Sequence, residues 1–140
     1  MAFKELTLNN FRCFKSTKIE LSPGINFFYG KNGSGKTSLL EAIHLCSSGK
    51  SFKSSNLQAL IAQGEDSFSL KSYDVDKGYI LSVTKEKNKS ISVLINNTKT
   101  TSSRLIREFP STAIHNNTFS FADASPDFRR KILDRALFVS

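Results

Sequence analysis

Residues 30–37 read Gly30-Lys31-Asn32-Gly33-Ser34-Gly35-Lys36-Thr37 and match the phosphate-binding P-loop pattern G-x-x-x-x-G-K-[ST] without departure. Glycines in such a loop can adopt φ values that side chains forbid, so the backbone can close around a phosphate with its N–H groups pointing inward. A helix that starts at the end of the loop adds the positive end of its dipole. We therefore expect this loop to hold the phosphates of a nucleotide.

The segments on either side of the loop fit this role. Before it, Ile25–Tyr29 is short and mostly apolar, which predicts a buried strand that ends at Gly30, with Phe27 and Phe28 in the core. After it, Thr37–Cys46 predicts a helix that Gly49 stops. One apolar stripe is expected on that helix, made of Leu39, Leu40, Ile43 and Cys46. A strand, a glycine-rich turn and a helix in this order argue against a chance match.

The chemistry of phosphate binding assigns roles within the loop. Lys36 is expected to reach between the β- and γ-phosphates as a compact positive charge. Thr37 is expected to offer its hydroxyl to Mg²⁺, and it is the one metal ligand that we assign. The expected cofactors are ATP and Mg²⁺. The expected nucleotide-binding residues of the loop are Gly30, Lys31, Asn32, Gly33, Ser34, Gly35, Lys36, Thr37 and Ser38.

The rest of the chain predicts a sheet with a few short helices. Strands are expected at Phe3–Leu8, Lys18–Leu21, Ser67–Tyr73, Gly78–Thr84 and Ser90–Ile95. The last three are separated by turns and predict an antiparallel meander. Short helices are expected at Asn56–Gln63 and Thr101–Phe109, and Thr112–Ile114 is expected to return to the sheet. Lys85, Lys87 and Lys89 are interpreted as the solvated tip of a hairpin.

Composition narrows the class of protein. The chain has 140 residues, enough for one hydrophobic core, and a formal net charge of +8 that indicates a polyanionic partner such as nucleic acid. Its two cysteines, Cys13 and Cys46, form neither a disulfide framework nor a metal-ligand spacing, and Cys46 is expected in the core. No signal peptide or membrane-spanning run is recognisable. We expect a reduced, cytoplasmic protein with no membrane partner.

A P-loop enzyme that hydrolyses ATP also needs an acidic residue at the end of a second buried strand. The sequence contains no run of four apolar residues followed by Asp or Glu, and no Leu-Ser-Gly-Gly-like signature of ABC ATPases. We therefore expect this chain to bind ATP without hydrolysing it, and assign no catalytic residue. Two alternatives stay open. The first is another ABC-type ATPase, or a complete small kinase or GTPase, that does not act on DNA. The second is a binding module with a relic P-loop.

Linked motifs along the chain resemble the start of the RecF family, the bacterial DNA repair ATPases of the ABC class related to the structural-maintenance-of-chromosomes (SMC) proteins. The motifs are Asn10-Phe11-Arg12, Leu21-Ser22-Pro23-Gly24, the P-loop with Leu39-Leu40-Glu41-Ala42-Ile43, Ser48-Gly49-Lys50-Ser51, Ser125-Pro126 and Phe128-Arg129-Arg130. The fold implied is an α/β P-loop NTPase lobe of the ABC-ATPase kind. Its mixed sheet would carry the P-loop helix and an antiparallel subsheet.

The resemblance also implies a domain organisation and a function. Residues 1–124 would form an N-terminal ATPase lobe, and residues 125–140 would begin a helix that leads to an absent helical arm and second ATPase half. The full-length protein would be a slow ATPase of DNA replication, recombination, repair and the SOS response. It would form a homodimer around ATP, bind DNA at single-strand/double-strand junctions or gaps, and load RecA there with RecO- and RecR-like mediators.

For single residues, the resemblance implies that Arg12 lies near the nucleotide and Asn32 near the γ-phosphate. The segment Ile114–Thr118 departs from the family, since a proline and two acidic residues are missing, and whether it still senses the nucleotide stays open. His115 is interpreted as an ordinary strand-end residue. A basic cluster near the C-terminus could contact DNA phosphates or pair with nearby acidic residues; it consists of Arg129, Arg130, Lys131 and Arg135.

Overall fold

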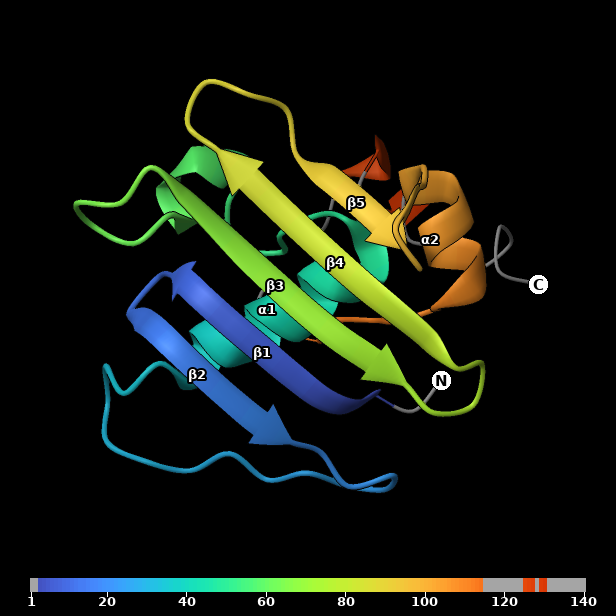
Figure 1. Ribbon diagram of the computed structural model, residues 1–140, viewed down its shortest axis with the longest axis horizontal. Coiled ribbons are helices and arrows are strands. Elements are labelled where there is room, and N and C mark those ends of the chain that lie inside the picture. Colours follow the sequence, from blue (N-terminus) through green and yellow to red (C-terminus); the bar gives the residue numbers. More distant parts are fainter. Residues whose placement is uncertain (1–2, 115–124, 128, 131–140) are drawn as a thin grey trace.

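An antiparallel sheet with one long helix across its inner face makes up most of the chain (Figure 1). The computed structural model describes residues 3–114, 125–127, 129 and 130. Six strands lie in the order β2-β1-β3-β4-β5-β6, and all five pairings of neighbours are antiparallel. Their bounds are β1 Phe3–Phe11, β2 Phe14–Glu20, β3 Ser67–Asp74, β4 Tyr79–Glu86, β5 Ser92–Ile95 and β6 Thr98–Lys99. The meander predicted from the turns is confirmed for β3, β4 and β5.

Alternation along the strands places the core on one face of the sheet. Leu6 and Leu8 of β1, Leu70 of β3, and Leu81 and Val83 of β4 are all buried toward this side. At both ends of β1 the buried residues are three positions apart, as in Phe3–Leu6 and Leu8–Phe11. A register shift between Phe3 and Glu5, and a left-handed Asn10 (φ 52), allow both phenylalanines to face inward as well.

Two helices cover the inner face of the sheet. The P-loop helix α1 (Lys36–Ser48) packs against β3, β4 and the short helix α2 (Ser102–Glu108). It ends as predicted, at a left-handed Gly49 (φ 67) whose N–H donates to the Leu45 carbonyl at 2.8 Å. Thr101 caps α2 by accepting a hydrogen bond from the Arg104 N–H. No described helix is both long and apolar enough to cross a membrane.

The apolar stripe of α1 is rotated relative to the prediction. Leu39 and Cys46 are buried as expected, but Leu40 is 48% exposed and Ile43 is only half-buried. Ala42 and Leu45 take their places in the core. Apolar spacing alone could not detect this rotation, because the polar residues Glu41, His44, Ser47 and Ser48 are also buried on this helix.

The predicted buried strand at Ile25–Tyr29 is wrong for this structure. The segment pairs with none of the described strands, and Ile25, Phe27 and Tyr29 are at least 80% exposed. Only Phe28 packs partly against the core. A strand with alternate apolar residues needs a neighbouring strand and a covering layer, and the described chain offers neither at this place. The sequence predicts a mixed sheet with an antiparallel subsheet, and the described residues form only antiparallel pairings.

Three smaller expectations also need correction. The helix predicted at Asn56–Gln63 is a four-residue 3₁₀ helix, η1 (Leu57–Leu60), and Thr112–Ile114 does not join the sheet. Lys85 is buried rather than solvated, because its ammonium donates to the Glu86 and Lys89 carbonyls, each at 2.6 Å, and closes the β4–β5 turn. The predictions for His115–Thr118, Lys131 and Arg135 lie outside the described residues.

Candidate nucleotide-binding site

The P-loop runs directly into α1, as the sequence predicts. Gly33 (φ 82) and Gly35 (φ 93) adopt left-handed conformations that favour glycine, and α1 begins at the next residue, Lys36. Gly35 occupies the N-cap position, where it has no side chain to satisfy the first N–H groups of the helix. These N–H groups and the positive end of the helix dipole form a backbone arrangement suited to an anion.

Gly35 is also fixed by its neighbours. A Cβ atom at this position would lie 2.8 Å from Sγ of Cys13 and 2.8 Å from Cζ of Phe14. Cys13 belongs to the turn between β1 and β2, and Phe14 is the first residue of β2, so the end of this hairpin packs against the base of the P-loop. Only a glycine fits this contact without displacing the hairpin or the loop.

The Lys36 side chain folds back over the loop. Its ammonium donates to the Gly30 carbonyl at 2.6 Å and to the Lys31 carbonyl at 2.8 Å. Ser34 N–H also donates to the Lys31 carbonyl, at 3.2 Å, which tightens the outer turn. These hydrogen bonds hold the positive charge of Lys36 against the first residues of the P-loop.

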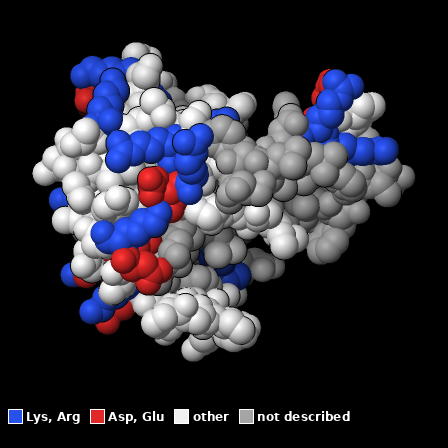
Figure 2. Space-filling model, turned by 90° about the vertical axis from the view of Figure 1, so that its right-hand side faces the viewer, with Lys and Arg blue, Asp and Glu red and all other residues white. Residues whose placement is uncertain are grey.

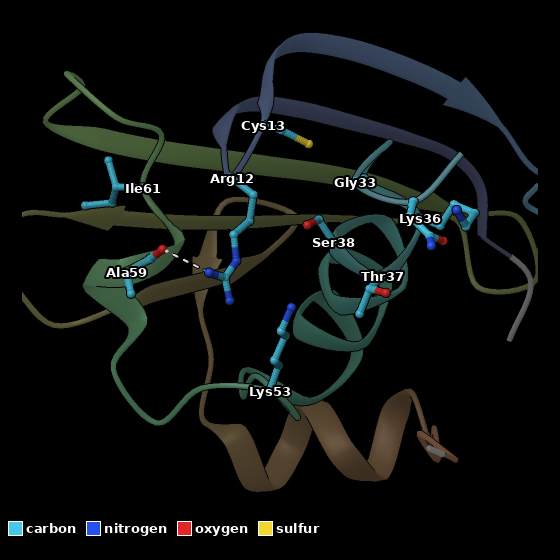
Figure 3. A pocket seen from close by; sticks show the side chains of 11 residues that line it. Arg12, Cys13, Gly33, Lys36, Thr37, Ser38, Lys53, Ala59 and Ile61 are labelled. Carbon is cyan, nitrogen blue, oxygen red and sulfur yellow. Dashed lines mark hydrogen bonds between the residues drawn. The ribbon is translucent and has the colours of Figure 1, made fainter. Parts of the chain in front are cut away.

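A pocket of about 540 Å³ opens beside the P-loop (Figure 3). Among the residues expected to bind nucleotide, the pocket is lined by Arg12, Asn32, Gly33, Gly35, Lys36, Thr37 and Ser38. Gly30, Lys31 and Ser34 belong to the outer turn of the loop and do not line it. The rest of the lining is Cys13, Lys53, Ala59 and Ile61. Most of the residues chosen from the sequence are therefore gathered around a single cavity.

Arg12 reaches the pocket from the two-residue turn between β1 and β2. Its backbone is left-handed (φ 54), and its N–H donates to the carbonyl of Leu60, the last residue of η1, at 2.8 Å. Its guanidinium forms a bidentate pair with Glu41 of α1, with Nε to Oε2 at 3.1 Å and Nη2 to Oε1 at 3.2 Å. Nη1 donates to the Ala59 carbonyl at 3.3 Å, the dashed line in Figure 3.

Sequence reasoning missed three residues of this site. Lys53 points into the pocket from the side opposite Arg12 (Figure 3), and the basic Gly49-Lys50-Ser51 stretch before it was the one available signal. Cys13 lines the pocket next to the P-loop. Glu41 has no exposed surface and holds Arg12, a pairing across 29 positions that no local pattern reveals.

The residues fit a nucleoside triphosphate in charge and shape. Three basic side chains, Arg12, Lys36 and Lys53, line the pocket together with the N-terminus of α1. Within the described residues, no group of three or more His, Cys, Asp and Glu could hold a metal ion by itself. A metal ion here would be bound mainly by phosphate oxygens and water, with a single hydroxyl ligand from the protein, which is the usual arrangement for Mg²⁺.

Comparisons with known proteins now bear on this site. Residues 5–135 match the AAA domain family. The chain belongs to this family. Within it, the predicted resemblance to the N-terminal portion of RecF is confirmed. The DNA replication and repair protein RecF of Thermoanaerobacter sp. (strain X514) is 38% identical over 143 residues, and that of Francisella tularensis subsp. novicida (strain U112) is 34% identical over 140 residues. Each comparison covers 99% of this chain.

This chain spans about two fifths of the length of these relatives, 39% and 40%. Two solved structures of the recombination mediator protein RecF, one described as RecF-ATP and one as RecF-ATPrS, superpose with a TM-score of 0.87. They are 29% and 28% identical and cover 99% and 98% of this chain, and 38% of their own. An SMC ATPase structure, 20% identical with a TM-score of 0.73, covers 97% of this chain and 99% of its own and agrees in fold. The α/β P-loop class predicted from the sequence is confirmed.

Proposed function

We propose that this chain is the ATP-binding lobe of a DNA replication and repair ATPase of the RecF kind. The observation that carries the proposal is the P-loop, with Gly35 at the N-cap of α1 and the Lys36 ammonium over the loop, next to a pocket that Arg12 and Lys53 also line. The α1 N–H groups and Lys36 would bind the phosphates, and Thr37 would donate its hydroxyl oxygen to Mg²⁺. The RecF-ATP relative supports ATP as the nucleotide.

Binding would require Lys36 to reorganise. Its ammonium now satisfies the Gly30 and Lys31 carbonyls, and a phosphate in the loop would compete with them for its three N–H donors. Asn32 lines the pocket at the outer turn of the loop, in keeping with a place near the γ-phosphate. Gly30, Lys31, Ser34 and Ser38 would shape the loop around the phosphates.

Hydrolysis is proposed to depend on protein outside this chain. The sequence contains no run of four apolar residues followed by Asp or Glu, and no ABC signature. The domain proposal follows: residues 1–124 form the N-terminal lobe, and residues 125–140 lead toward a helical arm and a second ATPase half. The exposed run Ile25–Tyr29 would pair with a strand of that second half, which would bury Ile25, Phe27 and Tyr29.

DNA binding, ATP-dependent dimerisation and RecA loading with RecO- and RecR-like mediators are the finer parts of the proposal. Their support is the net charge of +8 and the names of the relatives. On the face shown in Figure 2, basic side chains are interspersed with acidic ones. Contact with DNA would be sequence-independent and should weaken steeply with salt; binding to DNA that does not change between low and high salt would contradict it.

The test of nucleotide binding is a calorimetric titration with ATP and Mg²⁺. The parent should bind, and Lys36→Ala should lose binding, because the phosphates lose their central positive charge. Lys99→Ala is the control, since it removes the same charge from an exposed position of β6 that does not line the pocket, and it should retain the affinity. Equal affinity in the parent and Lys36→Ala would contradict the site.

A further inference from the structure

The pair formed by Arg12 and Glu41 is built unlike an ordinary surface ion pair. Glu41 lies in the middle of α1 with no exposed surface, and the Ser51 hydroxyl also donates to its Oε1. Burying a carboxylate is unfavourable unless its oxygens are paired, and here both oxygens accept from the same guanidinium. A buried charge with three organised hydrogen bonds indicates a selected arrangement rather than a chance contact.

The position of Glu41 connects the pair to the P-loop. Glu41 follows Thr37 by four residues, so the two side chains share one face of α1, one turn apart. The guanidinium that Glu41 holds therefore lies beside the first turn of α1, where Thr37 and Ser38 line the pocket. In Figure 3 Arg12 descends from the β1–β2 turn, with Ala59 on one side of it and α1 on the other.

The backbone of Arg12 supports the same reading. Its left-handed φ of 54 is a conformation that arginine rarely adopts and that glycine or asparagine would adopt with less strain. Backbone strain of this kind tends to persist where a side chain is needed in one particular place. The Leu60 carbonyl and the Ala59 carbonyl fix the turn and the guanidinium from the opposite side.

Two N–H groups of Arg12 remain for a ligand. A guanidinium has five N–H donors, and Glu41 and Ala59 take three of them. The side chain keeps 23% of its surface exposed, and Arg12 lines the pocket. Glu41 thus fixes the plane of the guanidinium and leaves part of it facing the cavity.

We propose that Glu41 is a positioning residue for nucleotide binding: it holds the Arg12 guanidinium at the wall of the pocket so that the two remaining N–H groups can donate to phosphate oxygens. This inference rests on the proposed function. Glu41 itself touches no nucleotide in this arrangement and acts through Arg12. The negative charge of Glu41 itself repels phosphate. If Glu41 acted only through this charge, removing the charge would strengthen ATP binding; if Glu41 positions Arg12, removing it weakens ATP binding.

The experiment measures the affinity for ATP and Mg²⁺ of the intact protein and of Glu41→Gln, Arg12→Ala and the double variant. Glu41→Gln should weaken binding by about tenfold, the effect of one misplaced charge-assisted contact. In the Arg12→Ala background, Glu41→Gln should cause no further loss, because the residue that it positions is gone. Melting temperatures recorded in parallel separate folding from binding.

Each other outcome overturns the inference. Unchanged binding by Glu41→Gln would show that Glu41 does not position Arg12 for the nucleotide, and tighter binding would show that only its charge matters. An equal loss in both backgrounds would show that Glu41 acts without Arg12. If Glu41→Gln does not fold, Glu41→Asp replaces it, since it keeps the charge but shortens the reach to Arg12, and it should still weaken binding. A parent that binds no ATP would overturn the proposed function and this inference together, whereas failure of the positioning role alone leaves the parent's binding intact.

Discussion

Cys13 lies so close to Gly35 that a Cβ atom on the glycine would come within 2.8 Å of the cysteine sulfur. The contact joins the β1–β2 turn to the base of the P-loop, and the same turn carries Arg12. The hairpin and the phosphate-binding loop therefore cannot shift independently. Substitutions on either side of this contact should change the affinity of the pocket for nucleotide.

Gly35→Ala should both destabilise the fold and abolish ATP binding. The new methyl group would collide with Cys13 and Phe14, and φ 93 is unfavourable for alanine. Gly64→Ala is the matched control, because Gly64 has a similar φ of 86 but nothing within 4 Å of the added carbon. It should cost only the backbone strain, about 1 kcal/mol, and leave affinity unchanged. Urea unfolding and ATP calorimetry of both variants make the comparison; equal behaviour would mean that the contact with Cys13 does not matter.

The two cysteines should react very differently with a thiol reagent at pH 8. Burial raises the pKa of the Cys46 thiol to about 12, so it stays protonated and inaccessible. Cys13 is exposed and lines the pocket, so it should be labelled readily, and ATP with Mg²⁺ should slow its labelling. Mass spectrometry of the labelled protein identifies the site. Labelling of Cys13 at the same rate with and without ATP would argue against nucleotide in this pocket.

The ion pair between Lys77 and Glu108 should make stability depend on pH. The hydrogen bond from Lys77 lowers the pKa of Glu108 below its usual 4.5. Because the folded-state pKa is the lower one, the stabilisation is present above pH 4.5 and is lost as the pH falls through the folded-state value. Glu108→Gln should therefore cost about 0.2–1 kcal/mol at pH 7 and less at a pH below 4.5, in urea unfolding at low salt.

Asp66→Asn is the control for this pair. Lys87 also lowers the pKa of Asp66, but the Asp66 side chain is 93% exposed, against 29% for Glu108. Solvent should screen the exposed pair, so its removal should change stability less at either pH. A larger loss in Asp66→Asn than in Glu108→Gln would contradict this ranking.

Phe27→Ser tests whether the exposed run Ile25–Tyr29 is covered in the intact protein. In residues 1–140 alone the substitution should hardly change the melting temperature, because Phe27 is 84% exposed. In the intact protein it should lower the melting temperature, if a second ATPase half buries this side chain. Phe68→Leu is the control, since Phe68 is 1% exposed and should destabilise both forms. No difference between the two proteins for Phe27→Ser would contradict the proposed domain arrangement.

Local signals explain what the sequence could predict. The glycines and Lys36 of the P-loop, the Gly49 stop and the Thr101 cap depend on neighbouring residues, and the structure confirms these elements. The alternation in β3, β4 and β5 likewise reflects one buried face of a sheet. In such places the residues that cause a helix to end or a strand to bury one face are close together in the sequence.

Long-range partners explain what the sequence could not predict. Ile25–Tyr29 has the pattern of a buried strand, but a strand is buried only by what pairs with it and covers it. Lys85 seemed solvated because its acceptors are backbone carbonyls, which composition does not reveal. No local pattern assigns a role to Glu41, because its partner Arg12 is brought to it by the fold from the β1–β2 turn.

The pairing of β1 with β3 has a consequence for biosynthesis. Asn9 on β1 lies beside Ser69 on β3, sixty positions later in the chain, and the P-loop and α1 lie between them in the sequence. On the ribosome, the β1–β2 hairpin can form as soon as residue 20 has emerged, whereas the surface that seats α1 needs β3 and β4. A nascent chain paused before residue 67 would contain the whole P-loop sequence, but α1 would still lack β3 and β4, the strands against which it packs.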